Sequence, residues 1–257
     1  SVSVVDRLGS DDKWKNLRRR ALDELVDPSG LDDFLERRRD DVRYVIHMGA
    51  ISATTETDAD HLLKNNYEYS KALAEYSAAN NIRFIYASSA ATYGDGSLGF
   101  KDDNNLSYKL RPLNMYGYSK NLFDIWANKN NLLSRIAGIK YFNVFGPNEY
   151  HKGDMRSVVH KAFEQIRDTG KVKLFKSKHP DYKDGEQKRD FIYIKDAVDM
   201  TLFFLENKNA NGLYNVGSGK ARTWNDLVAA LFKALGKEPN IEYIELPEHL
   251  ADKYQYF

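Results

Sequence analysis

Hydrophobic positions along the chain form short apolar runs that alternate with longer amphipathic segments. Residues 82–86 form a largely apolar run of the kind that marks a buried strand, and polar Ser88 and Ser89 follow it. The segment from Asn114 to about residue 131 has helical spacing. Strands that alternate with helices predict βαβ units and a parallel sheet. We expect further strands at residues 1–6, 42–48, 139–145, 172–175, 191–194, 212–217 and 242–244, and further helices at residues 31–39, 58–80, 155–168, 196–207 and 222–235.

A serine at a strand end and a Tyr-x-x-x-Lys pattern together supply groups that can transfer a proton. Tyr116 and Lys120 lie one helical turn apart, so their side chains share one face of the predicted helix. A free phenol has a pKa of about 10, and a nearby ammonium lowers that pKa by stabilising the phenolate. Ser89 can bind the same substrate oxygen. Tyr-x-x-x-Lys alone is a common pattern, but with Ser89 it predicts removal of an alcohol proton while hydride passes to a nicotinamide.

The first residues of the chain predict a nucleotide-binding strand. Residues 1–6 alternate and end at Asp6, and an acidic residue at the end of the second strand of a dinucleotide-binding fold meets the adenosine ribose. Arg7 and Lys13 follow closely, and their charges suit a 2′-phosphate, which favours NADP over NAD. A strand followed by a basic, solvated loop explains the same residues equally well.

A glycine-rich turn of the G-x-G-x-x-G type is missing before Asp6. In a Rossmann fold that turn lets the pyrophosphate approach a helix N-terminus. We therefore expect that the sequence lacks the first strand and the turn of a longer chain.

Longer motifs occur in order along the chain. They are His-x-Gly-Ala-x-Ser-x-Thr-Thr-Glu from residue 47, Asn-Asn-Tyr-x-Tyr-Ser-Lys from residue 65, Tyr-Ala-Ser-Ser-Ala-Ala-Thr-Tyr-Gly from residue 86, and Glu-Tyr-His-Lys-Gly-Asp-Met from residue 149. With these motifs the chain resembles, over nearly its whole length, the ADP-L-glycero-D-manno-heptose 6-epimerase family of the extended short-chain dehydrogenase/reductase superfamily. The Ala-Thr-Thr-Glu and His-Lys-Gly stretches are the specific part of the resemblance.

The resemblance implies an isomerase that uses NADP to epimerise carbon 6 of ADP-glycero-manno-heptose for the lipopolysaccharide inner core. The carbon is oxidised to a ketone and reduced again on its other face, so a second acid/base is needed opposite Tyr116. The family uses a lysine that Lys152 matches, although outside the family a surface lysine would be the better interpretation. The resemblance assigns catalysis to Ser89, Tyr116, Lys120 and Lys152. It assigns cofactor binding to Asp6, Arg7, Lys13, Met48, Gly49, Ala50, Ile51, Ser52, Asn65, Tyr116, Lys120 and Val144, and substrate binding to Ser89, Asn143, Asp154, Lys161, Phe175, Lys176, Ser177, Lys178, Arg189 and Tyr254.

The resemblance also implies a domain organisation. A Rossmann-type doubly wound parallel sheet is expected in residues 1–146, to which residues 190–221 return, and a smaller α/β substrate domain in residues 147–189 and 222–257. The chain ends inside a motif that contacts the sugar nucleotide in the family, so we expect its C-terminus to be cut short as well. Family members form homo-oligomers. The chain departs from the family pattern at Asp154, where members often have serine, and at Lys161, where they often have histidine.

Two other functions fit part of the pattern. A 4-epimerase or dehydratase of the same superfamily would share the Ser/Tyr/Lys set. A dehydratase usually places an acidic pair beside the catalytic tyrosine or the strand end, whereas this chain has Ala90, Ala91 and Thr92. A non-catalytic relative is favoured by the missing glycine turn and opposed by the complete set of catalytic residues.

The composition argues against several classes of partner, namely nucleic acids, membranes and metal ions. The 257 residues carry 38 Lys and Arg against 37 Asp and Glu, a net charge of +1 that gives no general attraction to nucleic acid or membrane. No apolar run approaches the roughly 18 residues of a membrane span, and no signal peptide opens the chain. The chain has no cysteine, and its six histidines lack metal-ligand spacing. We therefore expect a cytoplasmic protein without a bound metal.

Overall fold

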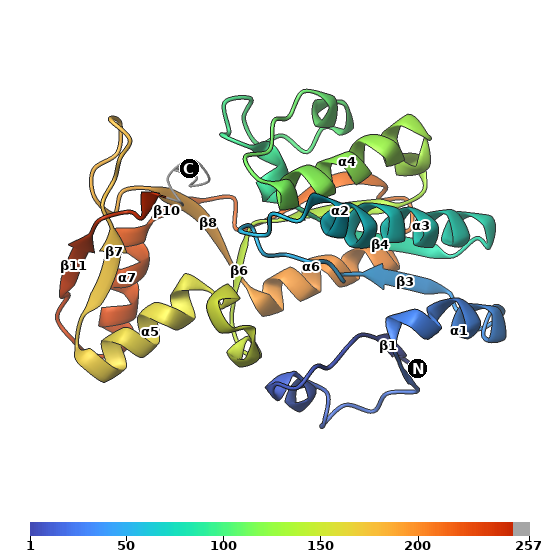
Figure 1. The fold of residues 1–257 in the computed structure, drawn as a ribbon, viewed down its shortest axis with the longest axis horizontal. Coiled ribbons are helices and arrows are strands. Elements are labelled where there is room, and N and C mark those ends of the chain that lie inside the picture. The colour runs from blue at the N-terminus through green and yellow to red at the C-terminus, as the bar shows by residue number, and fades with distance from the viewer. Residues whose placement is uncertain (249–257) are drawn as a thin grey trace.

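The computed structural model describes residues 1–248, and its centre is a four-stranded parallel sheet (Figure 1). Strand β4 (Arg83–Ser89) lies inside this sheet and is buried along nearly its whole length. The strand order is β3-β4-β5-β9, and the other members are β3 (Tyr44–His47), β5 (Ala137–Tyr141) and β9 (Gly212–Val216). All three pairings are parallel, as the alternation of strands and helices predicted.

Helices cover both faces of this sheet. On one face, α3 (Tyr69–Ala79) and α4 (Met115–Lys129) bury Leu73 and Phe123 against side chains of β4. On the other face, α6 (Ile194–Glu206) buries Phe204 against β4 and β5. The arrangement confirms the predicted doubly wound α/β fold. None of the helices in residues 1–248 combines the length and apolar character needed to cross a bilayer.

The N-terminal residues form a separate parallel pair of short strands, β1 (Val4–Val5) and β2 (Leu25–Val26). The helix α1 (Leu31–Arg37) follows, and its Leu31, Phe34 and Leu35 pack into the same core as Phe84 of β4. Val5 and Val26 of the pair pack into this core as well, and β1 confirms the strand that the alternation in residues 1–6 predicted. In the described chain, β1 and β3 are not hydrogen-bonded to each other.

The predicted strand at residues 139–145 is two strands in two sheets. After β5, Phe142 donates its amide hydrogen to Val216 (3.0 Å), and the chain then leaves the central sheet. Strand β6 (Asn143–Phe145) pairs instead with β8 (Lys188–Tyr193), which also pairs with β10 (Ala221–Thr223). This second sheet lies between the central sheet and the remaining part of the molecule (Figure 1).

That remaining part has a core of its own. Strand β7 (Val172–Phe175) pairs in parallel with β11 (Ile241–Ile244), and α5 (Val158–Thr169) and α7 (Trp224–Ala234) pack on it. The core residues are Ala162, Ile166, Val172, Leu174, Trp224, Val228 and Phe232. A separate core agrees with a smaller second domain, whose boundaries stay a prediction.

The predicted helix at residues 58–80 contains a turn of π-helix. The segment consists of α2 (Ala59–Leu62), the π-turn η3 (Leu63–Glu68) and α3, and Asp58 caps it by accepting from the His61 amide (2.9 Å). Asn66, in the π-turn, is completely buried. A π-turn often marks a functional position in a helix.

His47 joins the end of β3 to this helix. Its Nε2 lies 2.8 Å from the Ser70 hydroxyl, and its ring stacks on Phe84. Burial, together with the positive charge of Lys120, lowers the pKa of His47 to about 3. His47 is therefore neutral in the folded protein at neutral pH.

This burial predicts a pH-dependent stability. Unfolding raises the pKa of His47 from about 3 to its ordinary value near 6.5, so the unfolded state gains a proton first as pH falls. The contribution of His47 is full above pH 6.5 and is lost between pH 6.5 and 3. From pH 6.5 to 4.5, the wild type should lose about 2 kcal/mol more unfolding free energy than His47→Gln. Urea unfolding measures this difference, and His61→Gln, at an exposed position, should behave like the wild type. Equal pH slopes for His47→Gln and wild type would contradict a neutral buried His47.

Candidate active site

The predicted catalytic residues meet at the carboxyl ends of the parallel strands. Ser89 is the last residue of β4, and Tyr116 and Lys120 lie in the first turns of α4. The loop of residues 48–52 follows the neighbouring strand β3. Ligands of open α/β sheets bind outside this edge of the sheet. The structure therefore places the predicted proton-transfer set where such a fold binds its ligands.

Gly117 allows α4 to approach the end of β4. Asn114 caps the helix, and its side chain accepts a hydrogen bond from the Gly117 amide (2.8 Å). A Cβ atom at Gly117 would lie only 2.7 Å from the carbonyl oxygen of Ala91. Any larger residue would therefore push α4, and Tyr116 with it, away from the turn that follows Ser89.

The side chains of Ser89 and Tyr116 lie near each other at the end of β4. Ser89 is 9% exposed, and its Oγ accepts from the Ala91 amide (3.1 Å), which starts the 3-10 turn η4 (Ala90–Tyr93). Burial raises the pKa of Tyr116, and the hydrogen bond with Ser89 opposes part of that rise. The sequence predicted a lowered pKa instead. Burial outweighs it because a low-dielectric surrounding penalises the phenolate, so Tyr116 holds its proton at neutral pH.

Lys120, one helical turn after Tyr116, is buried against β4. Its side chain is almost fully covered, and its ammonium donates to the Ala87 carbonyl of β4 (2.8 Å). Burial lowers the pKa of Lys120 to about 8, against the opposing effect of Asp124. An ammonium has three donors, so Lys120 can bind a ligand hydroxyl while it holds Ala87.

Asn66 fixes the loop after β3. Its side-chain oxygen accepts from the Ile51 amide (2.8 Å), and its side-chain nitrogen donates to the Ile51 carbonyl (2.9 Å) and to the Ser119 hydroxyl (3.0 Å). Ser119 in turn donates to the carbonyl of Tyr116 (2.8 Å). Asn66 thus ties the predicted cofactor loop, residues 48–52, to the turn of α4 that carries Tyr116.

The resemblance assigned Asn65 to cofactor binding, and sequence reasoning gave no role to Asn66. The structure directs Asn65 away from the loop, and its side chain donates to the His61 carbonyl (2.8 Å). The spacing of Leu62, Asn66 and Ser70, all buried, is that of one helix face and could have identified Asn66. A cofactor contact of Asn65 stays a prediction.

The acidic and basic residues predicted for the adenosine end gather after β1. The Asp6 carboxylate accepts from the Lys13 ammonium (2.7 Å) and from the Arg7 amide (2.8 Å). The Arg7 guanidinium lies 3.5 Å from Asp27 and is largely exposed. Lys13 therefore neutralises the charge of Asp6. The Arg7 guanidinium is accessible to an anion because most of it is exposed.

Asn143 and Val144 lie in β6, next to the strand that carries Arg189. The Asn143 side chain donates to the carbonyl of Asp190 in β8 (3.2 Å). The Arg189 guanidinium stacks over the Trp224 ring, 5.6 Å from its centroid. The second sheet thus brings these three predicted ligand residues onto adjacent strands.

Lys152 lies on a segment that joins the second sheet to α5. It is exposed on the short 3-10 segment η7 (Tyr150–Met155), which follows β6. Contacts of the Asn16 side chain with the Asn148 carbonyl (3.2 Å) and the His151 ring (3.4 Å) join η7 to the N-terminal half. Among the contacts within residues 1–248, none joins Lys152 to Tyr116.

The predicted substrate residues divide into two groups. The Lys161 ammonium donates to the carbonyl of Asp154, so the two positions that depart from the family pattern touch each other. In the loop after β7, Lys176 pairs with Glu245 (2.6 Å), and the Ser177 amide donates to Asp184 (2.8 Å). Phe175 ends β7, and the exposed Lys178 follows in the same loop. Tyr254 lies outside the described residues.

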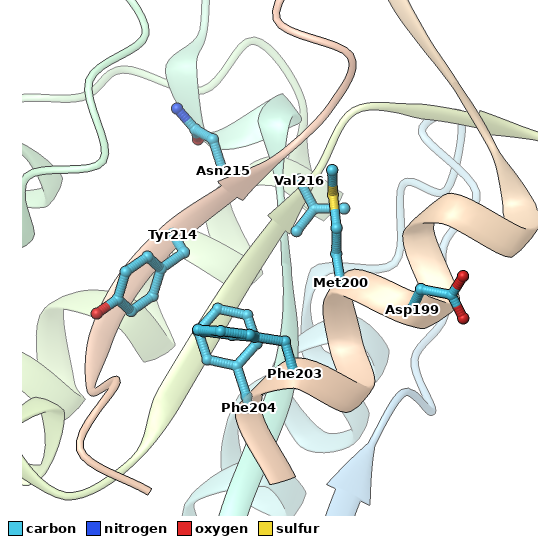
Figure 2. A pocket seen from close by; sticks show the side chains of 7 residues that line it. All are labelled: Asp199, Met200, Phe203, Phe204, Tyr214, Asn215 and Val216. Atoms are coloured by element: carbon cyan, nitrogen blue, oxygen red, sulfur yellow. The ribbon is translucent and has the colours of Figure 1, made fainter. Parts of the chain in front are cut away.

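A groove of about 390 Å³ lies elsewhere, between α6 and β9. Figure 2 shows that its lining side chains come from these two elements. They are Asp199, Met200, Phe203, Phe204, Tyr214, Asn215 and Val216, and none belongs to the predicted site. Nor does the chain up to residue 248 contain a cluster of three or more His, Asp or Glu that could bind a metal ion.

Comparisons with known proteins relate the whole chain to sugar-nucleotide enzymes. The model of the NAD dependent epimerase/dehydratase family matches residues 1–217. The ADP-L-glycero-D-manno-heptose-6-epimerase of Nitratidesulfovibrio vulgaris is 57% identical over 258 aligned residues, which cover 100% of this chain and 80% of that protein. The protein of the same name from Fusobacterium nucleatum is 49% identical, with 100% and 80% covered. The crystal structure of the Helicobacter pylori ADP-L-glycero-D-manno-heptose-6-epimerase has a TM-score of 0.76 and 29% identity, with 100% of this chain and 83% of that chain covered.

These findings confirm the predicted resemblance. Identity of this extent over the full length of the chain goes beyond a shared fold, and the family's description gives a nicotinamide dinucleotide as the class of cofactor. This chain therefore belongs to the NAD dependent epimerase/dehydratase family.

Proposed function

We propose that this chain catalyses the epimerisation of carbon 6 of ADP-glycero-manno-heptose with NADP as its cofactor. The observation that carries the proposal is that Ser89, Tyr116 and the buried Lys120 meet at the carboxyl end of β4, where the Lys120 ammonium donates to the Ala87 carbonyl. The substrate follows from the names of relatives at 57% and 49% identity. The proposal includes a role in making the heptose of the lipopolysaccharide inner core.

The described residues fit the two ribose ends of a nicotinamide dinucleotide. Lys120 can bind ribose hydroxyls at the nicotinamide end, because its ammonium uses one donor on Ala87. The loop of residues 48–52 is held open at the strand end by Asn66, and Val144 lies on β6 beyond it. At the adenosine end, neutralisation of Asp6 by Lys13 removes the repulsion that a 2′-phosphate would meet, and Arg7 can pair with that phosphate.

A nicotinamide dinucleotide held by Lys120 and the loop of residues 48–52 would supply the redox chemistry, the reversible transfer of a hydride from carbon 6. Ser89 and Tyr116 bind the oxygen on that carbon from one side. Because burial keeps Tyr116 protonated, its phenol is suited to donate a proton to the ketone oxygen as the alcohol forms again. Lys152, on the opposite side of the sugar, removes the alcohol proton in the same direction of reaction, and the roles exchange in reverse.

The remaining predicted residues hold the substrate and orient it. Asn143, Asp154, Lys161 and the loop of residues 175–178 bind the sugar nucleotide in this proposal. Arg189 binds the diphosphate, since a guanidinium pairs with phosphate oxygens in a bidentate manner. We also propose that the enzyme acts in the cytoplasm as a homo-oligomer.

A dehydratase of the same family is the second candidate, and the structure of η4 opposes it. Residues 90–93 of this turn follow Ser89 directly, and they contain no acidic side chain. A dehydratase needs an acid near the reacting carbons to expel water. Incubation with ADP-D-glycero-D-manno-heptose and separation of the products distinguishes the reactions, because an epimer keeps the mass that a dehydrated sugar loses.

The two-base assignment predicts two severe variants. Tyr116→Phe and Lys152→Met should each lower kcat roughly 10²–10⁴-fold, since each removes one proton donor or acceptor. Both should still bind NADP. The matched controls are Tyr118→Phe, exposed on the same helix, and Lys109→Met, also exposed, and both should keep normal activity. The measurement is the rate of epimer formation by chromatography. A Lys152→Met enzyme of undiminished kcat would refute the second base.

The cofactor assignment predicts a selective loss of affinity. Arg7→Ala should weaken NADPH binding roughly 10- to 100-fold, as expected for loss of one charge-assisted hydrogen bond to phosphate. NADH binding should change less than twofold. Fluorescence titration with both nucleotides measures the effect, and Arg20→Ala, at an exposed position nearby, serves as the control. Equal weakening of both nucleotides would show that Arg7 does not read the 2′-phosphate.

A further inference from the structure

A buried ion pair lies behind the catalytic set. The Lys140 ammonium is 3.3 Å from the Asp124 carboxylate, and the two side chains are 2% and 0% exposed. Asp124 follows Lys120 by one turn on the same helix, and Lys140 lies in β5, the strand beside β4. Neither residue was among those predicted for the site, and neither has a role in the proton transfers proposed above.

Asp124 holds α4 against β4. Its carboxylate accepts from the Tyr86 hydroxyl (2.8 Å) and from the Ser88 hydroxyl (2.7 Å). Burial and the Asp124 charge raise the pKa of Tyr86 far above its ordinary value, so this phenol stays a donor. Asp124 therefore fixes the distance between Lys120 and the last residues of the strand that ends at Ser89.

Lys140 reaches the backbone of Ser89 through Thr92. Its ammonium donates to the Thr92 hydroxyl (2.8 Å), and that hydroxyl donates to the Ser89 carbonyl (2.7 Å). The same ammonium lies 4.7 Å from the centroid of the Tyr93 ring. Lys140 thus fixes the turn η4, whose first amides are capped by the Ser89 hydroxyl.

Stability alone is a poor explanation for this pair. Removing two charges from water is costly, and well-packed apolar residues often replace a buried ion pair without loss. The hydrogen bonds of this pair lead to Tyr86, Ser88 and Thr92, and those residues surround the strand end that carries Ser89. The pair is placed where a small displacement would separate the hydroxyls of Ser89 and Tyr116.

We propose that Asp124 and Lys140 are positioning residues, and that the chain from Asp124 through Lys140 and Thr92 to the Ser89 carbonyl holds the Ser89 hydroxyl against Tyr116. The proposal rests on the proposed function, because it assigns these residues to the same reaction. Asp124 also acts on Lys120. Its charge raises the pKa of Lys120, which burial lowers to about 8. Neutral His47 on β3 also lies within electrostatic range of Lys120, and Tyr116 lies one turn before it on α4. Tyr86 on β4 and Lys140 on β5 face Asp124.

Thr92→Val is the sharpest test, since it removes the link and keeps both charges. The variant should lower kcat about tenfold and leave KM for ADP-heptose within twofold. Lys140→Met should likewise lower kcat with little change in KM, and Lys140→Arg should recover most of the lost kcat. If the two residues act through one link, the double variant Thr92→Val/Lys140→Met should have a kcat no lower than that of Lys140→Met. The matched control is Thr201→Val, a buried threonine of α6 that bonds Ala197 and Tyr141 on the far face of the sheet. A Thr92→Val enzyme as active as Thr201→Val would overturn the proposal.

A pH profile separates positioning from simple structural support. Asp124→Asn removes the anion that stabilises the Lys120 cation, so the alkaline limb of kcat should move to lower pH. An unmoved limb would overturn the effect on Lys120. Crystal structures of wild type and Thr92→Val supply a readout that needs no activity, and the distance between the Ser89 and Tyr116 hydroxyls should be longer in the variant. If the wild type fails to convert ADP-heptose, the proposed function fails, while an unchanged distance in Thr92→Val refutes the positioning role by itself.

Discussion

The close contact of α4 with the turn after β4 determines the geometry of the whole site. Because Gly117 has no Cβ, the helix can lie against the Ala91 carbonyl, where a Cβ would be 2.7 Å away. That contact brings Tyr116 near Ser89 and buries Lys120 against β4, where its ammonium donates to the Ala87 carbonyl. The three groups come from a strand end and a helix start that are distant in sequence. The position of Tyr116 therefore depends on the absence of a side chain at the next residue, Gly117.

Polar groups in the interior hold this contact in place. Asn66 ties the loop after β3 to α4, His47 ties β3 to α3, and the ion pair of Asp124 and Lys140 ties α4 to β4 and β5. Burial of each polar group costs desolvation energy, and hydrogen bonds within the core offset that cost. The interior around the central sheet therefore orients these side chains as well as excluding water. Burial there raises the pKa of Tyr116 and lowers the pKa of Lys120 to about 8, which is close to neutral pH.

Local patterns in the sequence predicted the sheet, its helices and the placing of Ser89, Tyr116 and Lys120, because these depend on periodicity and strand ends. Features that depend on tertiary packing were not predictable in the same way. The break at Phe142 follows from pairing of β6 with β8, and the π-turn selects Asn66 over Asn65. Burial sets the direction of the Tyr116 pKa shift, and burial cannot be predicted from the spacing of Tyr116 and Lys120 in the sequence. Neither local pattern nor packing identifies Lys152, which was predicted from the family resemblance alone.

The central claim is that carbon 6 is oxidised and reduced again within one site. The most direct measurement is the mass of the product when the protein epimerises ADP-D-glycero-D-manno-heptose in D₂O. If the hydrogen leaves as hydride and returns from the nicotinamide, the epimer should carry no deuterium on carbon. Incorporation of one deuterium per turnover would mean that the hydrogen exchanges as a proton. That result would contradict the roles assigned to Ser89, Tyr116 and Lys120.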